Sequence, residues 1–421
     1  MVRVLFVSAV PDLRGGAEQV LLDMLGNPKV EPVLALPGHG PLESYAARIN
    51  APVIYFSPGC VLNVHRPLKI TAALRAIPDA LRSAGQLRRA ARQYGCGIIH
   101  ANGLKVHVLT TLATLFSRDL RSIVHLHDIP YSPLERLFWR LLGKVSDRVV
   151  VVSRPCWPGS VLPPNVRIIP NGVAASTGTL GVPAPTLAGP KPMLRVPTAT
   201  LAVSAPRSEV FRLGFVGRFH RHKGLLLLVD WLAAARDAGL EFECRFRGGS
   251  DPDDPAYWES VQDKLQQVKL LDRIHIDGWR TGKSVYEGLD AIVVPSDCPD
   301  PLPRVVLEAG AQGLPVIALP TGGIGSMIID GHTGFLVSGT SGFVDVLGKL
   351  IGNPDLRDAV GSAAQRHIAA EFTLPRFYER FDALYGELEG HGDPAVVATP
   401  VATAPIVTGT PLQRGDPAAR S

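Results

Sequence analysis

Short runs of β-branched and apolar residues alternate along this chain with longer stretches of amphipathic, helical spacing. Several runs are apolar on both faces, which is typical of strands in a parallel sheet covered by helices on both sides. In the first half the expected strands are Val4–Val7, Pro32–Leu36, Val53–Phe56, Ile98–Ile99, Ile123–Leu126, Val149–Val152 and Val166–Ile169. Helical patterns at 17–26, 67–94, 103–116 and 133–144 separate them. This alternation predicts an α/β fold with a doubly wound parallel sheet.

The alternation stops at 174–209, where six prolines and many small residues follow no period. A second alternating block then begins. Its expected strands are Leu213–Val216, Glu243–Arg247, Ile274–Ile276, Ala291–Val294, Val316–Leu319 and Phe335–Val337, and helical patterns at 355–371 and 375–389 close it. The Pro-rich composition of the stretch from 391 onward predicts a disordered tail.

The chain therefore divides into five parts. They are an N-terminal Rossmann-like domain at 1–173, a Pro/Ala/Thr-rich linker at 174–209, a C-terminal Rossmann-like domain at 210–374, a closing helix at 375–390 and a tail at 391–421. We expect the closing helix to return to the first domain.

Composition excludes several classes of protein. An apolar fraction of 46% with a mean hydropathy of +0.15 excludes a disordered chain, and 19% charged residues argue against a coiled-coil rod. The five cysteines form no Cys-x-x-Cys pair, so we expect no disulfide framework or zinc ribbon, but buried thiols of a reducing compartment. The sequence contains no apolar stretch of the ~18 residues that a membrane span needs and no signal peptide, so we expect a cytoplasmic location.

A basic, glycine-flanked loop follows the first strand of the second block. Arg218 and Lys223 lie five residues apart in it, beside Gly217 and Gly224. Ligands of open α/β sheets bind beyond the carboxyl ends of strands, and two cations there suit a diphosphate. The alternative is an ordinary solvated basic turn.

The stretch from Asp300 to Glu308 is the most informative in the sequence. It follows the expected strand Ala291–Val294, and a helix should begin near Pro303 or Arg304. Two carboxylates at such an edge can accept hydrogen bonds from sugar and ribose hydroxyls, and the first-turn N–H groups can bind phosphate oxygens. Alternatively, Asp300 caps the helix and Glu308 is an exposed helix acid.

These motifs and others occur in a fixed order in both halves of the chain. The set is Gly15-Gly16-Ala17-Glu18, His127-Asp128, Ile169-Pro170-Asn171-Gly172-Val173, Gly217-Arg218, Lys223-Gly224, Asp300-Pro301, Glu308-Ala309, Gly313-Leu314-Pro315-Val316 and Gly322-Gly323. In this order the chain resembles the retaining, nucleotide-sugar-dependent glycosyltransferases of the GT-B fold, and more narrowly those of family 4 (glycosyl transferases group 1). The resemblance spans about residues 3–390.

The resemblance implies two Rossmann-like domains that face a central cleft, the first binding the acceptor and the second the nucleotide sugar. It implies transfer of a hexose from a nucleotide diphosphate sugar to a hydroxyl of a glycan, glycolipid or small molecule. The anomeric configuration would be retained, with no metal and no cofactor. A role in the synthesis of cell-envelope glycans or glycolipids is the corresponding expectation.

The resemblance also assigns roles to individual residues. Arg218 and Lys223 would neutralise the donor diphosphate, Glu308 would hold the ribose hydroxyls, and Asp300 would contact the transferred sugar. His127 would lie beside that sugar, either orienting it or helping with protons. The full expected set is His127 and Asp300 as catalytic residues, and Gly15, Gly16, Arg218, Lys223, Leu302, Pro303 and Glu308 as donor-binding residues.

The chain departs from the family pattern at four places. Asp300 replaces the usual Glu, and Leu302-Pro303 replaces the common Phe-Gly. Ser326 stands where a Glu is frequent, and Ala174 stands where an Asp is frequent. A second hypothesis is therefore a catalytically degenerate GT-B protein that binds sugar nucleotide or glycan without turnover. A nicotinamide dehydrogenase is a third hypothesis, disfavoured because Gly15-Gly16 lacks the Gly-x-Gly-x-x-Gly spacing.

Two amphipathic segments of the first half raise the question of a membrane. Residues 62–92 contain seven Lys/Arg against one Asp, with interleaved leucines. They suit either a surface helix packed on the sheet or a peripheral contact with anionic lipid, including the inner face of the cytoplasmic membrane. In the segment 133–144 we expect Leu134, Leu137, Phe138 and Leu141 to face the core. A net charge of +5 and the absence of a recognition module argue against nucleic acid.

Overall fold

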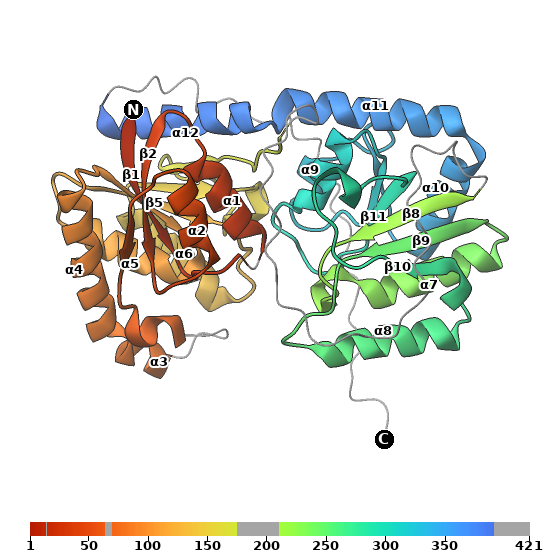
Figure 1. The fold of residues 1–421 in the computed structure, drawn as a ribbon, viewed down its shortest axis with the longest axis horizontal. Coiled ribbons are helices and arrows are strands. Elements are labelled where there is room, and N and C mark those ends of the chain that lie inside the picture. Colours follow the sequence, from red (N-terminus) through yellow and green to blue (C-terminus); the bar gives the residue numbers. More distant parts are fainter. Residues whose placement is uncertain (14, 64–69, 175–209, 391–421) are drawn as a thin grey trace.

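The computed structural model describes residues 1–13, 15–63, 70–174 and 210–390, which form two α/β domains side by side (Figure 1). The predicted tail at 391–421 lies outside the described residues, as does the predicted linker beyond Ala174. Each domain is built around one parallel sheet, as the sequence predicts.

The first sheet has seven strands in the order β3-β2-β1-β4-β5-β6-β7. Its strands are β1 (Val2–Ser8), β2 (Val30–Leu36), β3 (Val53–Tyr55), β4 (Ile98–Asn102), β5 (Arg121–Leu126), β6 (Arg148–Val151) and β7 (Val166–Ile168). Each strand pairs in parallel with its neighbours, and all seven predicted strands are confirmed.

Helices cover both faces of this sheet. On one face lie α1 (Gly16–Leu25), α2 (Pro41–Arg48) and the last helix, α12 (Leu374–Glu389). On the other lie α4 (Ile77–Gln93), preceded by α3 (Ile70–Arg75), and then α5 (Leu104–Thr114) and α6 (Pro133–Val145). Strand β1 shows why both faces need cover, because Phe6 packs with the first group and Leu5 with the second. The sequence analysis named no helix at α2.

The second sheet has six parallel strands in the order β10-β9-β8-β11-β12-β13. They are β8 (Phe211–Val216), β9 (Phe242–Arg247), β10 (Ile274–Ile276), β11 (Ala291–Val294), β12 (Val316–Ala318) and β13 (Phe335–Leu336). One face packs against α7 (Leu225–Asp237), α8 (Pro255–Gln267) and α10 (Thr340–Gly352), and the other against α9 (Arg304–Ala311) and α11 (Pro354–Glu371). Short 3-10 turns connect the elements at Gly59–Asn63, Arg154–Cys156, Arg221–Lys223, Leu271–Arg273, Gly282–Val285 and Ile324–Ser326.

Helix α12 crosses back from the second domain to the first (blue, Figure 1). Its Phe377, Phe381 and Leu384 are buried in the same cluster as Phe6. The last helix is therefore part of the core of the first domain.

Helix α6 faces the opposite way from our expectation. Leu134, Leu137 and Leu141 are 42%, 52% and 53% exposed, so the prediction that they belong to the core is wrong; Phe138 alone of that set packs partly against it. The buried side carries Trp139, Leu142 and Gly143 instead. Trp157 packs so closely on Gly143 that an added Cβ would lie 2.6 Å from its ring. Because both sides of this helix are apolar, spacing alone did not identify the side that fits the sheet.

The structure also bears on the expectations for the cysteines and for membrane-spanning helices. Cys96, Cys156 and Cys244 are buried free thiols, but Cys60 is exposed and Cys298 half-buried, so the expectation of buried cysteines is wrong for those two. Among the described helices, none combines the length and apolar character needed to cross a membrane.

Candidate active site between the two sheets

The strand order of each sheet reverses beside its first strand, between β1 and β4 and between β8 and β11. Loops that leave the carboxyl ends of strands on either side of such a switch point diverge and leave a crevice for a ligand. The predicted residues lie on these loops: Gly15 and Gly16 after β1, Lys223 after β8, and Asp300 after β11.

Lys223 and Asp300 meet although they are 77 residues apart. Lys223 Nζ donates a hydrogen bond to Asp300 Oδ2 at 2.6 Å, and the two side chains are 35% and 18% exposed. Gly224 makes the approach possible, because its φ is +69° and a Cβ there would lie 2.0 Å from the Pro295 carbonyl oxygen. The structure thus brings together a predicted phosphate cation and the predicted sugar-binding carboxylate.

Asp300 is not the cap of the following helix. Helix α9 begins at Arg304, and Pro303 occupies the N-cap position without a side-chain hydrogen bond. Asp300 is held instead by its backbone, since Gly323 N donates to its carbonyl oxygen at 2.8 Å. A Cβ on Gly322, whose φ is +59°, would lie 2.1 Å from that oxygen. The double glycine is therefore a close-packed support for the Asp300 loop.

Glu308 is engaged from two sides. Tyr286 Oη donates to its Oε2 at 2.8 Å, and Arg304 Nε donates to its Oε1 at 3.2 Å. Burial raises the pKa of Tyr286 well above 10, and the neighbouring Glu308 carboxylate adds to that rise, so the phenol stays a proton donor. Glu308 is an oriented carboxylate rather than a free surface acid.

Arg304 also joins the two domains. Its Nη1 donates to Asp23 Oδ2 of α1 at 2.8 Å and lies 3.4 Å from the Gly172 carbonyl oxygen. Burial raises the pKa of the Asp23 carboxyl, and the Arg304 guanidinium opposes the rise. A Cβ built on Gly16 would lie 4.0 Å from Arg304 Cδ, so the start of α1 faces the start of α9.

Arg218 and the two residues before Arg304 complete the predicted donor set. Arg218 Nη1 lies 3.6 Å from Oδ2 of the buried Asp251, on the loop after β9. Arg218 is thus held beside the loop that follows β9, next to β8 in the sheet. Leu302 is 5% exposed and packs in the core beneath α9. Its side chain is therefore structural in this conformation, as is that of the buried Pro303.

His127 is fixed by Asn102 at the carboxyl ends of the central strands of the first sheet. The distance from His127 Nε2 to Asn102 Oδ1 is 2.7 Å, and Asn102 Nδ2 donates to the Ala17 carbonyl oxygen at 3.0 Å. Because the amide oxygen accepts, His127 Nε2 carries the proton and Nδ1 presents a lone pair. Burial lowers the pKa of His127 to about 3, which makes the ring neutral near pH 7.

A row of buried histidines lies behind His127. The His125 ring lies 4.1 Å from that of His127 and 5.4 Å from that of His100, measured between centroids. His100 Nδ1 is hydrogen-bonded to Tyr385 Oη of α12 at 2.9 Å, and His107 Nε2 donates to the His125 carbonyl oxygen at 2.9 Å. Burial, reinforced by the neighbouring histidines, lowers the pKa of His100 and His125. The same desolvation lowers the pKa of His107 to about 3.

Two contacts bring the Asp300 loop against the first domain. Tyr131 Oη, four residues after His127, donates to the Pro299 carbonyl oxygen at 3.4 Å. Ser153 Oγ donates to the Pro301 carbonyl oxygen. The segments that carry His127 and Asp300 are thus held on opposite sides of one interdomain contact.

Five residues of this arrangement were missed from sequence: Asp23, Asn102, Ser153, Tyr286 and Arg304. Asn102 carried a usable signal, because it ends a buried strand and precedes Gly103. Arg304 lies four residues before Glu308 on the predicted helix, a spacing that brings side chains together. The other three depend on contacts between distant segments.

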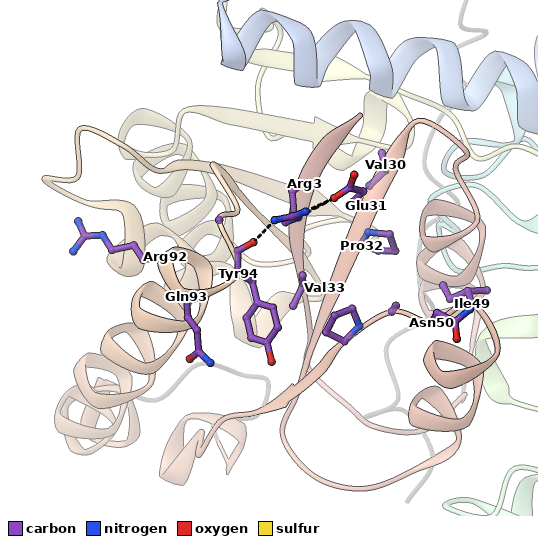
Figure 2. Close-up of a pocket in the computed structure, with 13 residues that line it drawn as sticks. Arg3, Val30, Glu31, Pro32, Val33, Ile49, Asn50, Arg92, Gln93 and Tyr94 are labelled. Carbon is purple, nitrogen blue, oxygen red and sulfur yellow. Dashed lines mark hydrogen bonds and ion pairs between the residues drawn. The ribbon is translucent and has the colours of Figure 1, made fainter.

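One surface hollow of the described residues lies elsewhere. A pocket of about 770 Å³ opens near the amino ends of β1 and β2 and is lined by Arg3, Glu31 and Tyr94, among others (Figure 2). Arg3 donates to Glu31 Oε2 at 2.9 Å and to the Tyr94 carbonyl oxygen at 3.0 Å. Its charges are therefore paired within the protein. No three His, Cys, Asp or Glu side chains of the described ranges gather to hold a metal ion.

Solved structures show the same architecture. HepE of Anabaena, crystallised with UDP, has a TM-score of 0.72 at 19% identity, covering 92% of this chain and 100% of that one. Sucrose-phosphate synthase of Thermosynechococcus elongatus has a TM-score of 0.68 at 18% identity, covering 93% and 100%. The predicted fold is confirmed: this is a GT-B protein with two Rossmann-like domains.

Family comparisons give the narrower identity. Residues 210–353 match the family described as Glycosyl transferases group 1, and residues 15–176 match Glycosyltransferase Family 4. The chain belongs to these glycosyltransferases.

Curated relatives match over a shorter range. The chain is 33% identical over 187 residues to a D-inositol 3-phosphate glycosyltransferase of Corynebacterium jeikeium, covering 43% of this chain and 44% of the relative. It is 33% identical over 184 residues to one of Actinosynnema mirum, covering 42% and 44%. The match thus spans less than half of these relatives.

Proposed function

We propose that this glycosyltransferase moves a hexose from a nucleotide diphosphate sugar to a hydroxyl acceptor, with retention of configuration and without a metal ion. The observation that carries the proposal is the Lys223–Asp300 pair, held at the switch point of the second sheet across from His127. In this assignment the second domain binds the donor and the first domain binds the acceptor.

The contacts support an assignment of the donor residues. Lys223 and Arg218 meet the diphosphate, and the first-turn N–H groups of α9 add hydrogen-bond donors. Glu308, oriented by Tyr286 and Arg304, accepts from the ribose hydroxyls. A uridine donor is the first candidate, because HepE was crystallised with UDP and with UDP-glucose. That ligand belongs to a protein of 19% identity, so it guides the order of testing.

The proposed chemistry is front-face attack. The acceptor oxygen forms its bond to the anomeric carbon on the face from which the diphosphate leaves, and the leaving phosphate oxygen takes the acceptor proton. Lys223 and Arg218 stabilise the charge that develops on the diphosphate. Asp300 accepts from a sugar hydroxyl. Neutral His127 accepts through Nδ1, a role in orienting the sugar that needs no proton transfer.

The first experiment is a thermal-shift panel of UDP, GDP and ADP, each with its glucose or mannose ester, in the absence of metal. A ligand that binds only the native state raises the midpoint. We expect a shift with one nucleotide series, lost in Lys223→Ala and kept in Arg221→Ala, whose side chain pairs with Asp254. No shift with any nucleotide contradicts the donor assignment.

Turnover and stereochemistry need a second measurement. With the donor base known, hydroxyl acceptors can be screened, beginning with inositol phosphates because of the names of the curated relatives. The anomeric coupling in the NMR spectrum of the product tests retention, and activity in chelator tests metal independence. An inverted product contradicts the front-face scheme, whereas turnover of any acceptor rules out the binding-only alternative.

A further inference from the structure

Helix α6 carries an apolar stripe that points into solvent. Leu134, Leu137, Leu141 and Val145 follow one another at helical spacing and are 42%, 52%, 53% and 54% exposed. From Leu134 to Val145 the stripe is about 16 Å long. It lies opposite the side of Trp139, Leu142 and Gly143, which packs against the first domain. Side chains exposed singly need no explanation, but an aligned row of aliphatic ones marks an interaction surface.

Cations border this stripe along one side. Arg136, Arg140 and Lys144 recur every fourth residue between the exposed stripe and the buried side. Arg140 is tied down, because its Nε donates to the Pro158 carbonyl oxygen at 2.7 Å. The acid of the helix, Glu135, is engaged at the amino end, where its carboxylate accepts from the backbone N–H groups of Tyr131 and Ser132. The outward half of α6 therefore combines aliphatic side chains with positive charge.

The neighbouring helices also expose apolar side chains. Helices α4, α5 and α6 pack on one face of the first sheet, and α5 contacts both of the others. The outer side of α4 exposes Ile77 and Leu81 at 48% and 58%, and Phe116, which follows α5, is 95% exposed. Residues 70–145 contain 11 Lys/Arg against 4 Asp/Glu. Arg88 is not part of this surface, because it donates to the Ala113 carbonyl oxygen.

We propose that the outer face of α6, with the adjoining faces of α4 and the α5 end, docks on an anionic lipid surface. The Leu134–Val145 stripe enters the headgroup region, and Arg136 and Lys144 meet lipid phosphates. An apolar stripe flanked by Lys and Arg is the arrangement of helices that lie in a membrane interface. A protein partner is the weaker fit, since the α6 stripe consists of Leu and Val, which are under-represented among the residues that dominate binding in protein interfaces.

The position of α6 links this surface to the cleft. The helix starts directly after Tyr131, whose hydroxyl contacts Pro299 beside Asp300. A membrane-bound α6 would therefore hold the His127 loop close to the lipid surface. If the proposed function holds, the acceptor hydroxyl belongs to a lipid or a lipid-linked glycan.

The test is sedimentation of the full chain with vesicles of phosphatidylcholine alone and of phosphatidylcholine mixed with phosphatidylglycerol. We expect binding to the anionic vesicles only, weakened by salt. The double variant Leu137→Gln/Leu141→Gln should reduce the partition coefficient about tenfold or more. The matched control Leu271→Gln/Ile276→Gln, whose side chains are 56% and 54% exposed on the second domain, should bind like the wild type.

Three results would overturn the proposal. They are no binding to anionic vesicles, equal binding by the wild type and the α6 double variant, and a dimer in solution that the α6 variant dissociates. In the last case a second copy of the chain covers the stripe. The nucleotide thermal shift of the α6 variant reports separately on the donor site, so failure of the docking surface is distinguishable from failure of the proposed function.

Discussion

The two edges that meet in the cleft differ in charge. The edge of the second sheet carries Lys223, Asp300, Arg304 and Glu308, joined in ion pairs and hydrogen bonds. At the first edge, His127 is neutral and is held by Asn102, with further neutral histidines behind it. If the proposed function holds, this difference separates two tasks. The second edge supplies countercharge to a charged donor, and the first edge supplies a polar surface for an uncharged hydroxyl.

The largest expected effect is a loss of stability at low pH, caused by the buried histidines of the first domain. His100, His107 and His125 are buried neutral, whereas an unfolded chain binds their protons near pH 6.5. The contribution of these neutral rings to the free energy of unfolding should be fully present above that pH and should fall as the pH decreases from 6.5 toward 3. Between pH 7 and pH 5 each histidine should cost about 2 kcal/mol of unfolding free energy.

Urea unfolding as a function of pH measures this loss. His125→Phe should make the slope shallower, since one proton-binding group is gone from the unfolded state. Equal slopes for the wild type and His125→Phe would mean that the histidine row titrates like ordinary surface groups.

The next effect concerns the charged side. Lys223→Ala should lower kcat/KM at least 100-fold, about 3 kcal/mol, because a cation at the leaving diphosphate acts mainly in the transition state. The unfolding free energy should change by about 1 kcal/mol or less, since the pair with Asp300 is partly exposed. Initial rates and thermal midpoints test both statements, with Arg221→Ala as the neighbouring control. Full activity of Lys223→Ala would contradict the assignment of Lys223 as the countercharge of the diphosphate.

Gly322→Ala tests the support of Asp300. Both this variant and Gly331→Ala place a Cβ at positive φ, but only the first meets the Asp300 backbone, while the second has nothing within 4 Å. We expect Gly331→Ala to cost about 1 kcal/mol of stability with normal kinetics. Gly322→Ala should cost more and lower kcat about tenfold. If the two variants behave alike, Gly322 is needed only for its positive φ and not for its close approach to the Asp300 backbone.

The smallest expected effect concerns the link between the two edges. Asp23→Asn removes the ionic partner of Arg304 in the first domain but leaves Arg304 on Glu308. We expect kcat/KM to fall about tenfold, or 1.4 kcal/mol, with nucleotide affinity changed less than threefold. Asp382→Asn is the control, because Asp382 accepts from Asn27 away from the cleft. A large loss of nucleotide affinity would place Asp23 within the donor site itself.

The features that could be predicted from sequence are those that depend on residues close together in the chain. The strands were found because β1 and its neighbours are apolar on both faces, and the Lys223 and Asp300 loops were found because glycine and charge stand at strand ends. The outward side of α6 was misjudged because two apolar stripes compete on one helix. Asp23, Tyr286 and Ser153 were missed because their partners lie far along the chain, so that only packing brings them together.

The return of α12 means that the first domain is discontinuous in sequence. The chain leaves it after Val173 and re-enters at Leu374, and these two crossings lie together: Val173 N donates to the Phe372 carbonyl oxygen at 2.8 Å and Leu374 N to that of Val173 at 3.0 Å. Because the two crossings lie side by side, they form a single pivot. The two domains can rotate about it while both hydrophobic cores stay intact. A fragment ending at residue 173 would lack Phe377, Phe381 and Leu384 and expose the sheet face that they cover.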